Sequence, residues 1–305
     1  MEEKGFVNIK NWMYRNARPL DLARWQYHFE GASKDQVLLY LAAYQNEDGG
    51  FSKALEADSW NPNSSPIQTW VATEILKEIN FEDKNHPIVK GILKYLASKK
   101  DFVNHRWLNT IKSNNDYPGA PWWRHKDDET ASEGFNPSIC LAGFVIKYSD
   151  KDSELYRMSV AIIEEGLDDF MSRGQSEMHV LSNYMTLLGY LEDTNFKIDR
   201  LDMFKEKIAQ QVNRLIEKDT CKWATNYVCK PSQFINSPSS IFYDANEEVV
   251  SFELDFLMKQ RNEEGVWPIT WQWGDFDDAY AISSRWWQGD LVIKYMLFLK
   301  NFNRL

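Results

Sequence analysis

The residues with the most distinctive chemistry are four near the C-terminal end, Asp275-Phe276-Asp277-Asp278. Carboxylates crowded this closely cannot all ionise, so one of them is expected to keep its proton at neutral pH. In apolar surroundings that proton becomes a strong acid, able to protonate an alkene. The alternative is structural, because Asp and Glu are favoured in the first turn of any helix. The tetrad is therefore either an acid catalyst or a helix start.

A second acidic pair, Glu56 and Asp58, follows an early turn of the chain as the tetrad follows a late one. If the two turns lie at the same end of the fold, both acidic sets could face one cavity mouth as an acid and a base. In the other interpretation, the pair accepts hydrogen bonds from backbone N–H groups and locks the turn.

Aromatic and basic residues suggest a binding surface. Trp122, Trp123, Arg124 and His125 lie in a long loop expected over residues 108 to 135, and such loops in compact domains are often lids or binding loops. The indoles could stack on a sugar ring or a cation, and His125 could transfer protons. The tryptophans could equally pin the loop to the fold.

Further binding candidates lie in segments expected to be helical or next to the tetrad. They are Trp271, Trp273, Arg18, Trp25 and Tyr184. Arg18 belongs to an arginine-rich stretch suited to bidentate contacts with a carboxylate or phosphate, although such residues also form ordinary ion pairs. Tyr184 would face a cavity if its helix is an inner one. The two tryptophans could line the cavity mouth or pack between repeats.

Composition excludes several classes of protein. The net charge of −10 argues against nucleic-acid binding, which leaves a basic footprint. The acidic start lacks the apolar core of a signal peptide, and no apolar run is long enough for a membrane segment, so a cytoplasmic protein is predicted. Cys140, Cys221 and Cys229 lack CxxC spacing, which favours buried reduced thiols. No metal or cofactor is predicted, the expected ligand is a small or lipid-like molecule, and a protein partner or homo-oligomer stays open.

The elements that must position these residues are helices of two kinds. One kind is apolar around most of its circumference and should be enclosed, as in residues 33–44, 65–77, 136–147, 178–191 and 247–258. The other kind has a single apolar stripe, as in residues 88–96, 155–170 and 204–216. Their alternation predicts an all-α fold, an α/α toroid of two concentric rings with about 10–12 helices, formed by residues 1–305 as a single domain.

A repeated pattern supports this fold. Its best copy, Tyr44 to Trp70, contains a helix stop, a glycine turn, an aromatic residue, acids and a helix start. Ser65 is the expected N-cap, Pro66 occupies the first helical position, and Gln68 is expected to complete a capping box. Worn copies follow at Trp107 to Asn136-Pro137, Trp223 to Ser237-Pro238, and Gln260 to Asp275, the last with one residue more between its glutamine and glycine.

Two of these turns carry a resemblance. Gln45xxxGly49xPhe51 and Gln260xxxxGly265xTrp267 resemble the Gln/Trp repeat of squalene and terpenoid cyclases, whose toroid also occurs in protein prenyltransferase β subunits. Over nearly its whole length the chain is similar to small bacterial prenyltransferase/squalene-oxidase-repeat proteins. The similarity is carried by residues 15–29, 44–51, 118–123 and 287–299.

The resemblance implies a toroid fold and a possible activity. By analogy with the DxDD motif of cyclases, Asp277 would be the proton donor, and Asp275 and Asp278 would tune it. The implied function is acid-catalysed chemistry on an apolar, isoprenoid-like substrate in a central aromatic-lined cavity. The alternatives are a non-catalytic toroid that binds a ligand or peptide, and a carbohydrate-active α/α barrel. The zinc ligands and DDxxD motif of prenyltransferases have no match in this chain.

Overall fold

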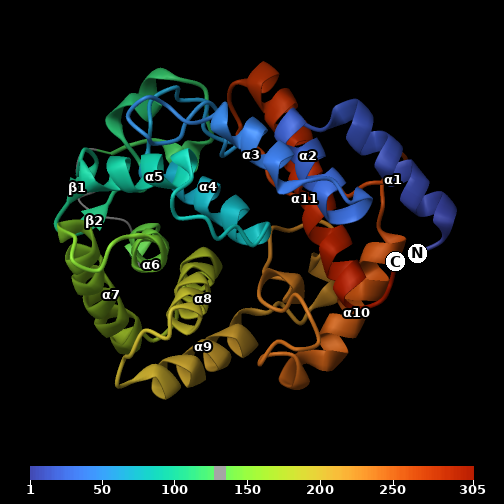
Figure 1. Ribbon diagram of the computed structural model, residues 1–305. Coiled ribbons are helices and arrows are strands. Elements are labelled where there is room, and N and C mark those ends of the chain that lie inside the picture. The colour runs from blue at the N-terminus through green and yellow to red at the C-terminus, as the bar shows by residue number, and fades with distance from the viewer. Residues whose placement is uncertain (127–134) are drawn as a thin grey trace. The chain divides into compact units, whose positions relative to one another are not determined.

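The computed structural model describes residues 1–126 and 135–305. Their regular structure is almost entirely helical, which confirms the predicted all-α class (Figure 1). The described residues contain one small antiparallel sheet, formed by β1 (Phe102–Val103) and β2 (Arg106–Trp107). The chain divides into two compact units: unit 1 contains Met1–Tyr40 with Val212–Leu305, and unit 2 contains Leu41–Gln211. The single domain and the toroid stay predictions.

Unit 2 is centred on α6, an apolar helix buried along nearly its whole length. Helices α4, α7 and α8 pack against α6, and α5 packs against α7. Gly143 of α6 permits close contact with α8, because a Cβ there would lie 2.6 Å from Cδ2 of Tyr190. The helices of this unit are α4 (Pro66–Glu78), α5 (Pro87–Ala97), α6 (Ser138–Tyr148), α7 (Glu154–Ser172) and α8 (Met178–Asp193).

Unit 1 is formed by both ends of the chain. Helix α11 packs against α1 and α2; α11 is drawn in red in Figure 1, and α1 and α2 in blue. The helices of this unit are α1 (Glu3–Asn16), α2 (Pro19–Glu30), α10 (Glu247–Lys259) and α11 (Asp277–Asn301). Two further helices, α3 (Lys34–Ala42) and α9 (Leu201–Leu215), cross a boundary between the units.

The helices predicted from apolar periodicity are all present within a few residues of their expected places. The start of α4 is also as predicted, since Pro66 is its first residue and the Ser65 side chain accepts a hydrogen bond from the Gln68 backbone N–H. The predicted capping box is wrong, however. The Gln68 side chain bonds to Glu56 and Ser59, whereas the Ser65 N–H donates to the Phe51 carbonyl.

The cysteines are in part as predicted. All three are free thiols. Cys140 and Cys229 are buried, and burial raises the pKa of Cys140. The prediction of burial is wrong for Cys221, which is exposed in the short 3₁₀ helix Thr220–Lys222.

Candidate functional site

The first repeat turn is closed by Gln45. Its Nε2 donates to the carbonyl oxygens of Gly49 at 2.9 Å and of Ile88, in the first turn of α5, at 3.1 Å. Gly91 of α5 leaves room for this amide, because a Cβ there would lie 2.3 Å from the same nitrogen and would displace it. Gly49 has a φ of +94°, which favours glycine. Gln45 therefore joins the turn to α5, which is a structural role.

The fourth repeat turn has the same backbone hydrogen bonds as the first. Asn46 N–H donates to the Gly50 carbonyl at 2.8 Å, and Asn262 N–H donates to the Val266 carbonyl at 2.8 Å. In each turn the glycine N–H donates to the asparagine carbonyl at 2.9 Å. The two turns thus align without an insertion, so the expected extra residue is wrong. Arg261, and not Gln260, is the counterpart of Gln45.

The Glu56 and Asp58 side chains are buried in the loop between α3 and α4, with 5% and 2% of their surface exposed. Glu56 Oε2 accepts the Asp58 N–H at 2.9 Å. Gln68 of α4 accepts the Glu56 N–H at 2.9 Å and donates to the Ser59 carbonyl at 2.7 Å. These contacts are those of a locked loop, as the structural interpretation predicts.

The same loop is joined to the segment that carries the paired tryptophans. The Asp58 carbonyl accepts the Ala120 N–H at 2.8 Å, and Ser59 forms a bridge with Gly119. The Asn61 side chain donates to Asn114 Oδ1 at 2.8 Å and to Ser113 Oγ at 2.9 Å. The acidic pair and the tryptophan segment, which are far apart in the sequence, therefore form one assembly within unit 2.

Within this assembly the residues after Ala120 are fixed individually. Pro121–Trp123 forms a 3₁₀ helix, and the Trp123 carbonyl accepts a bond from Asn114 Nδ2 at 2.9 Å. His125 exchanges two bonds with the Asn115 side chain, and its Nδ1 lies 3.0 Å from Thr110 Oγ1. The Trp122 side chain is 46% exposed. Residues 127–134 of the expected long loop lie outside the described residues.

The aspartate tetrad is in a different environment from the one that acid catalysis requires. Asp275, Asp277 and Asp278 are exposed, the last two in the first turn of α11. Asp275 Oδ1 accepts the N–H of Phe276, whose φ is +56°. The three aspartates therefore lack the apolar surroundings that a proton donor needs. Their exposure and their place at the start of α11 match the helix-start interpretation.

The tryptophans before the tetrad are packed against other aromatic rings of unit 1. Trp273 is buried, with its ring centroid 5.8 Å from that of Tyr280. Trp271 lies edge-on to Tyr227 at 5.6 Å and to Trp287 at 5.4 Å. These contacts correspond to the packing alternative.

Arg18, Trp25 and Tyr184 are core residues by their contacts. Arg18 pairs with buried Asp21, which also binds Arg24. Trp25 Nε1 donates to Glu30, and Tyr184 OH donates to the Gly166 carbonyl, each at 2.7 Å. The anion site suggested for Arg18 is thus occupied by a carboxylate of the chain itself.

The network around Arg18 extends to α11. Arg24 Nη1 lies 2.9 Å from Asp290 Oδ1, and Lys294 Nζ lies 2.8 Å from Asp290 Oδ2. Burial raises the pKa of Asp290, but the charges of Lys294 and Arg24 outweigh this effect and place it below its usual range. This network fastens α2 to α11.

Glu253 was not among the predicted site residues. It is fully buried on α10 and accepts bonds from the N–H and Oγ of Ser232, at 2.7 and 2.6 Å. Burial raises its pKa to about 7, while the Ser232 bonds and the charge of Lys230 act in the opposite direction. The available signal was a charged residue in the apolar run of residues 249 to 258, although Asp255 in the same run gives the same signal and is exposed.

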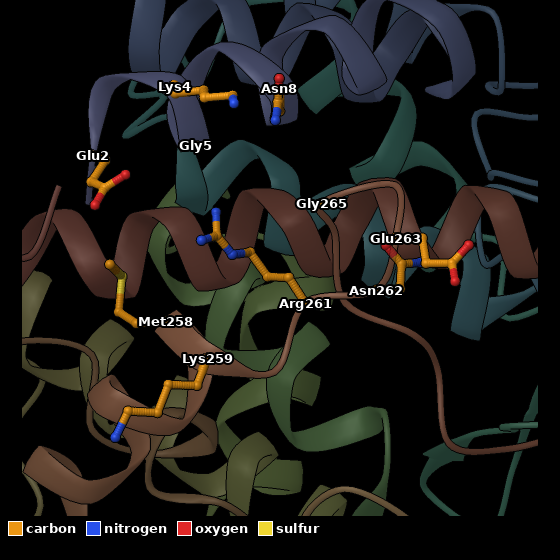
Figure 2. A pocket seen from close by; sticks show the side chains of 10 residues that line it. All are labelled: Glu2, Lys4, Gly5, Asn8, Met258, Lys259, Arg261, Asn262, Glu263 and Gly265. Atoms are coloured by element: carbon orange, nitrogen blue, oxygen red, sulfur yellow. The ribbon is translucent and has the colours of Figure 1, made fainter.

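A pocket of about 390 Å³ lies in unit 1, between the first turns of α1 and the fourth repeat turn (Figure 2). It is lined by Glu2, Lys4, Gly5, Asn8, Met258, Lys259, Arg261, Asn262, Glu263 and Gly265. None of the predicted site residues lines it. In residues 1–126 and 135–305, no three His, Cys, Asp or Glu side chains gather closely enough to hold a metal ion.

Comparison of the chain with protein-family models, with curated proteins and with solved structures finds no match. Among the described residues, no helix combines the length and apolar character needed to cross a bilayer.

Proposed function

We propose that the chain is a ligand-binding protein of the helical-repeat toroid class, and that it binds a carbohydrate through Trp122. The identical hydrogen bonds of the first and fourth repeat turns support the repeat class. One observation carries the binding function: Trp122 is 46% exposed in a segment whose neighbouring residues are all held by hydrogen bonds.

An exposed indole on a hydrogen-bonded segment suits a sugar ring. The ring provides a flat apolar face for the C–H groups of a pyranose, and little conformational freedom is lost when it stacks. Arg124 and His125, both partly exposed, lie next in the chain and supply polar groups for sugar hydroxyls. The buried loop of Glu56 and Asp58 is joined to this segment through Asp58 and Ser59.

The contacts favour this function over acid catalysis on an isoprenoid-like substrate. Such catalysis needs a carboxyl group in apolar surroundings, whereas Asp277 is exposed to solvent. Glu56 Oε2 accepts the Asp58 N–H, so this hydrogen bond gives the pair the structural role of holding the loop.

Glycan-array binding, followed by titration with the tightest soluble glycan, tests the proposal. We expect Trp122→Ala to weaken binding by about tenfold or more, because stacking on the indole is lost. Recovery of the glycan unaltered after incubation would support binding without chemistry.

Ile241→Ala is the matched control, since Ile241 is 67% exposed and lies in unit 1. It should leave glycan affinity and melting temperature unchanged. The proposal fails if the wild-type protein retains no glycan, or if Trp122→Ala binds as tightly as the wild type. A lipid or peptide released from the purified protein in native mass spectrometry would support the alternative ligands.

A further inference from the structure

The first and fourth repeat turns differ at one position, and the side chain at this position decides whether hydrogen bonds join the turn to a neighbouring helix. Gln45 and Arg261 each lie four residues before the turn glycine. In the first turn the Gln45 amide has two carbonyl acceptors and lies against Gly91 of α5. The fourth turn repeats this contact with α1, because a Cβ at Gly5 would lie 2.9 Å from Arg261 Nη1.

In the fourth turn, however, no carbonyl acceptor for the Arg261 side chain is found among the described residues. Within the described chain, the polar contact found for the Arg261 guanidinium is with the Met1 sulfur at 3.8 Å, which is a weak acceptor. The guanidinium carries five N–H donors in a rigid fork. Figure 2 shows it pointing across the pocket toward Gly5. The Arg261 side chain therefore lies where the Gln45 side chain lies in the first turn, but it lacks the two carbonyl acceptors that Gln45 has.

The charges around the pocket favour an anion. Lys4, Lys259 and Arg261 line it against Glu2 and Glu263, which leaves a cationic excess. Both glutamates are exposed, and neither forms an ion pair with Arg261. A guanidinium that is partly buried and has no carboxylate partner is matched best by the two oxygens of an oxyanion.

We propose that this pocket binds an oxyanion, a carboxylate or a phosphate group, through two parallel hydrogen bonds from Arg261. The anion takes the place of the two carbonyl acceptors that Gln45 has in the first turn. The glycine at position 5 leaves the space that the guanidinium needs for this geometry.

The site is tested by titrating the full chain with inorganic phosphate and, separately, with acetate, at constant ionic strength set with sodium chloride. The readout is the amide ¹⁵N–¹H shifts of residues 262–265. We expect saturable shifts in the wild-type protein. Tighter phosphate binding would assign a phosphate-bearing ligand, and tighter acetate binding would assign a carboxylate.

Three variants separate the site from general electrostatic attraction. Gly5→Ala keeps every charge but displaces the guanidinium, and Arg261→Gln restores the residue of the closed turn. Each should weaken binding by about tenfold or more. Lys10→Gln removes one charge from α1 outside the pocket and should change affinity less than about twofold.

The proposal is overturned if neither anion gives a saturable shift in the wild-type protein. It is also overturned if Gly5→Ala binds as the wild type does, or if Lys10→Gln weakens binding as much as Arg261→Gln. If Gly5→Ala melts early, Arg261→Gln decides the matter, because glutamine is already the residue of a well-formed turn at Gln45.

Discussion

At the level of single residues, Gln68 connects α4 to the loop before it through both ends of one amide group. The side chain is buried, accepts the Glu56 N–H and donates to the Ser59 carbonyl. Removing a buried side chain leaves its hydrogen-bond partners unsatisfied. The free-energy cost of an unsatisfied buried group is larger than the net stabilisation that one hydrogen bond provides. The loop that supports the tryptophan segment therefore depends on this side chain.

We expect Gln68→Ala to lower the free energy of unfolding by about 1–3 kcal/mol. Urea denaturation measures the change. Gln36→Ala, at an exposed position of α3, is the matched control and should cost less than about 0.5 kcal/mol. Equal losses in the two variants would show that Gln68 does not fasten the loop.

Glu253 makes stability depend on pH. Its pKa is about 7 in the folded protein and 4.5 ordinarily, so the folded state binds the proton more tightly than the unfolded state. This contribution to stability is complete below pH 4.5 and is lost as the pH rises through 7.

Glu253→Gln should remove this dependence and keep an acceptor for Ser232. Relative to the variant, the wild-type protein is expected to lose about 2 kcal/mol of unfolding free energy between pH 5 and pH 8. Urea unfolding at the two pH values gives the difference. Glu248→Gln, at an exposed position of the same helix, should follow the wild type. Parallel curves for wild type and Glu253→Gln would contradict the assigned pKa.

At the level of elements, the contact between α6 and α8 depends on the absence of a side chain at Gly143. Alanine favours a helix interior over glycine by about 1 kcal/mol, but its Cβ would lie 2.6 Å from the Tyr190 ring. Overpacking of a well-packed core typically costs about 1–3 kcal/mol. The steric cost of the added Cβ is therefore expected to exceed the gain in helix propensity.

Gly143→Ala should thus destabilise the protein by about 1–2 kcal/mol, despite its better helix propensity. Thermal unfolding followed by circular dichroism tests this expectation. Gly174→Ala is the control, because nothing lies within 4 Å of a Cβ at Gly174. If Gly143→Ala raised the melting temperature, Tyr190 would have to move aside at little cost.

The helices could be predicted because their signals are local. An apolar stripe or an enclosed apolar run fixes a helix within its own sequence, as in α5 and α6. The Ser65 cap is also local and was correct. The Gln68 contacts were not predicted, because its partners Glu56 and Ser59 lie in a loop whose path depends on tertiary packing.

The candidate sites were harder to predict for the same reason. The tetrad is a pattern of residue types, but an acid catalyst is defined by burial, and Asp277 is exposed. The junction of Asp58 with the tryptophan segment joins residues about sixty positions apart, and no local pattern marks it. The equivalence of Arg261 and Gln45 follows from the backbone hydrogen bonds of the asparagine and glycine residues after them. The sequence alone favoured Gln260, because it is also a glutamine close before a turn glycine.

At the level of the whole molecule, the two units differ in whether they are continuous in the sequence. Unit 2 is one continuous stretch, Leu41–Gln211, whereas unit 1 is made from two segments that flank it. The contact between Arg24 and Asp290 in unit 1 therefore spans 266 positions of the chain.

The discontinuity of unit 1 has a consequence for the order of folding. Contacts between distant residues form late, because a long loop must close before they gain any stability. A growing chain that has emerged to residue 211 already contains all of unit 2, whereas α2 must wait for α11. In pulse-labelling hydrogen exchange during refolding, amides of α6 and α8 should gain protection before those of α2 and α11. Until α11 has emerged, the face of α2 that α11 covers is a surface for a chaperone to bind.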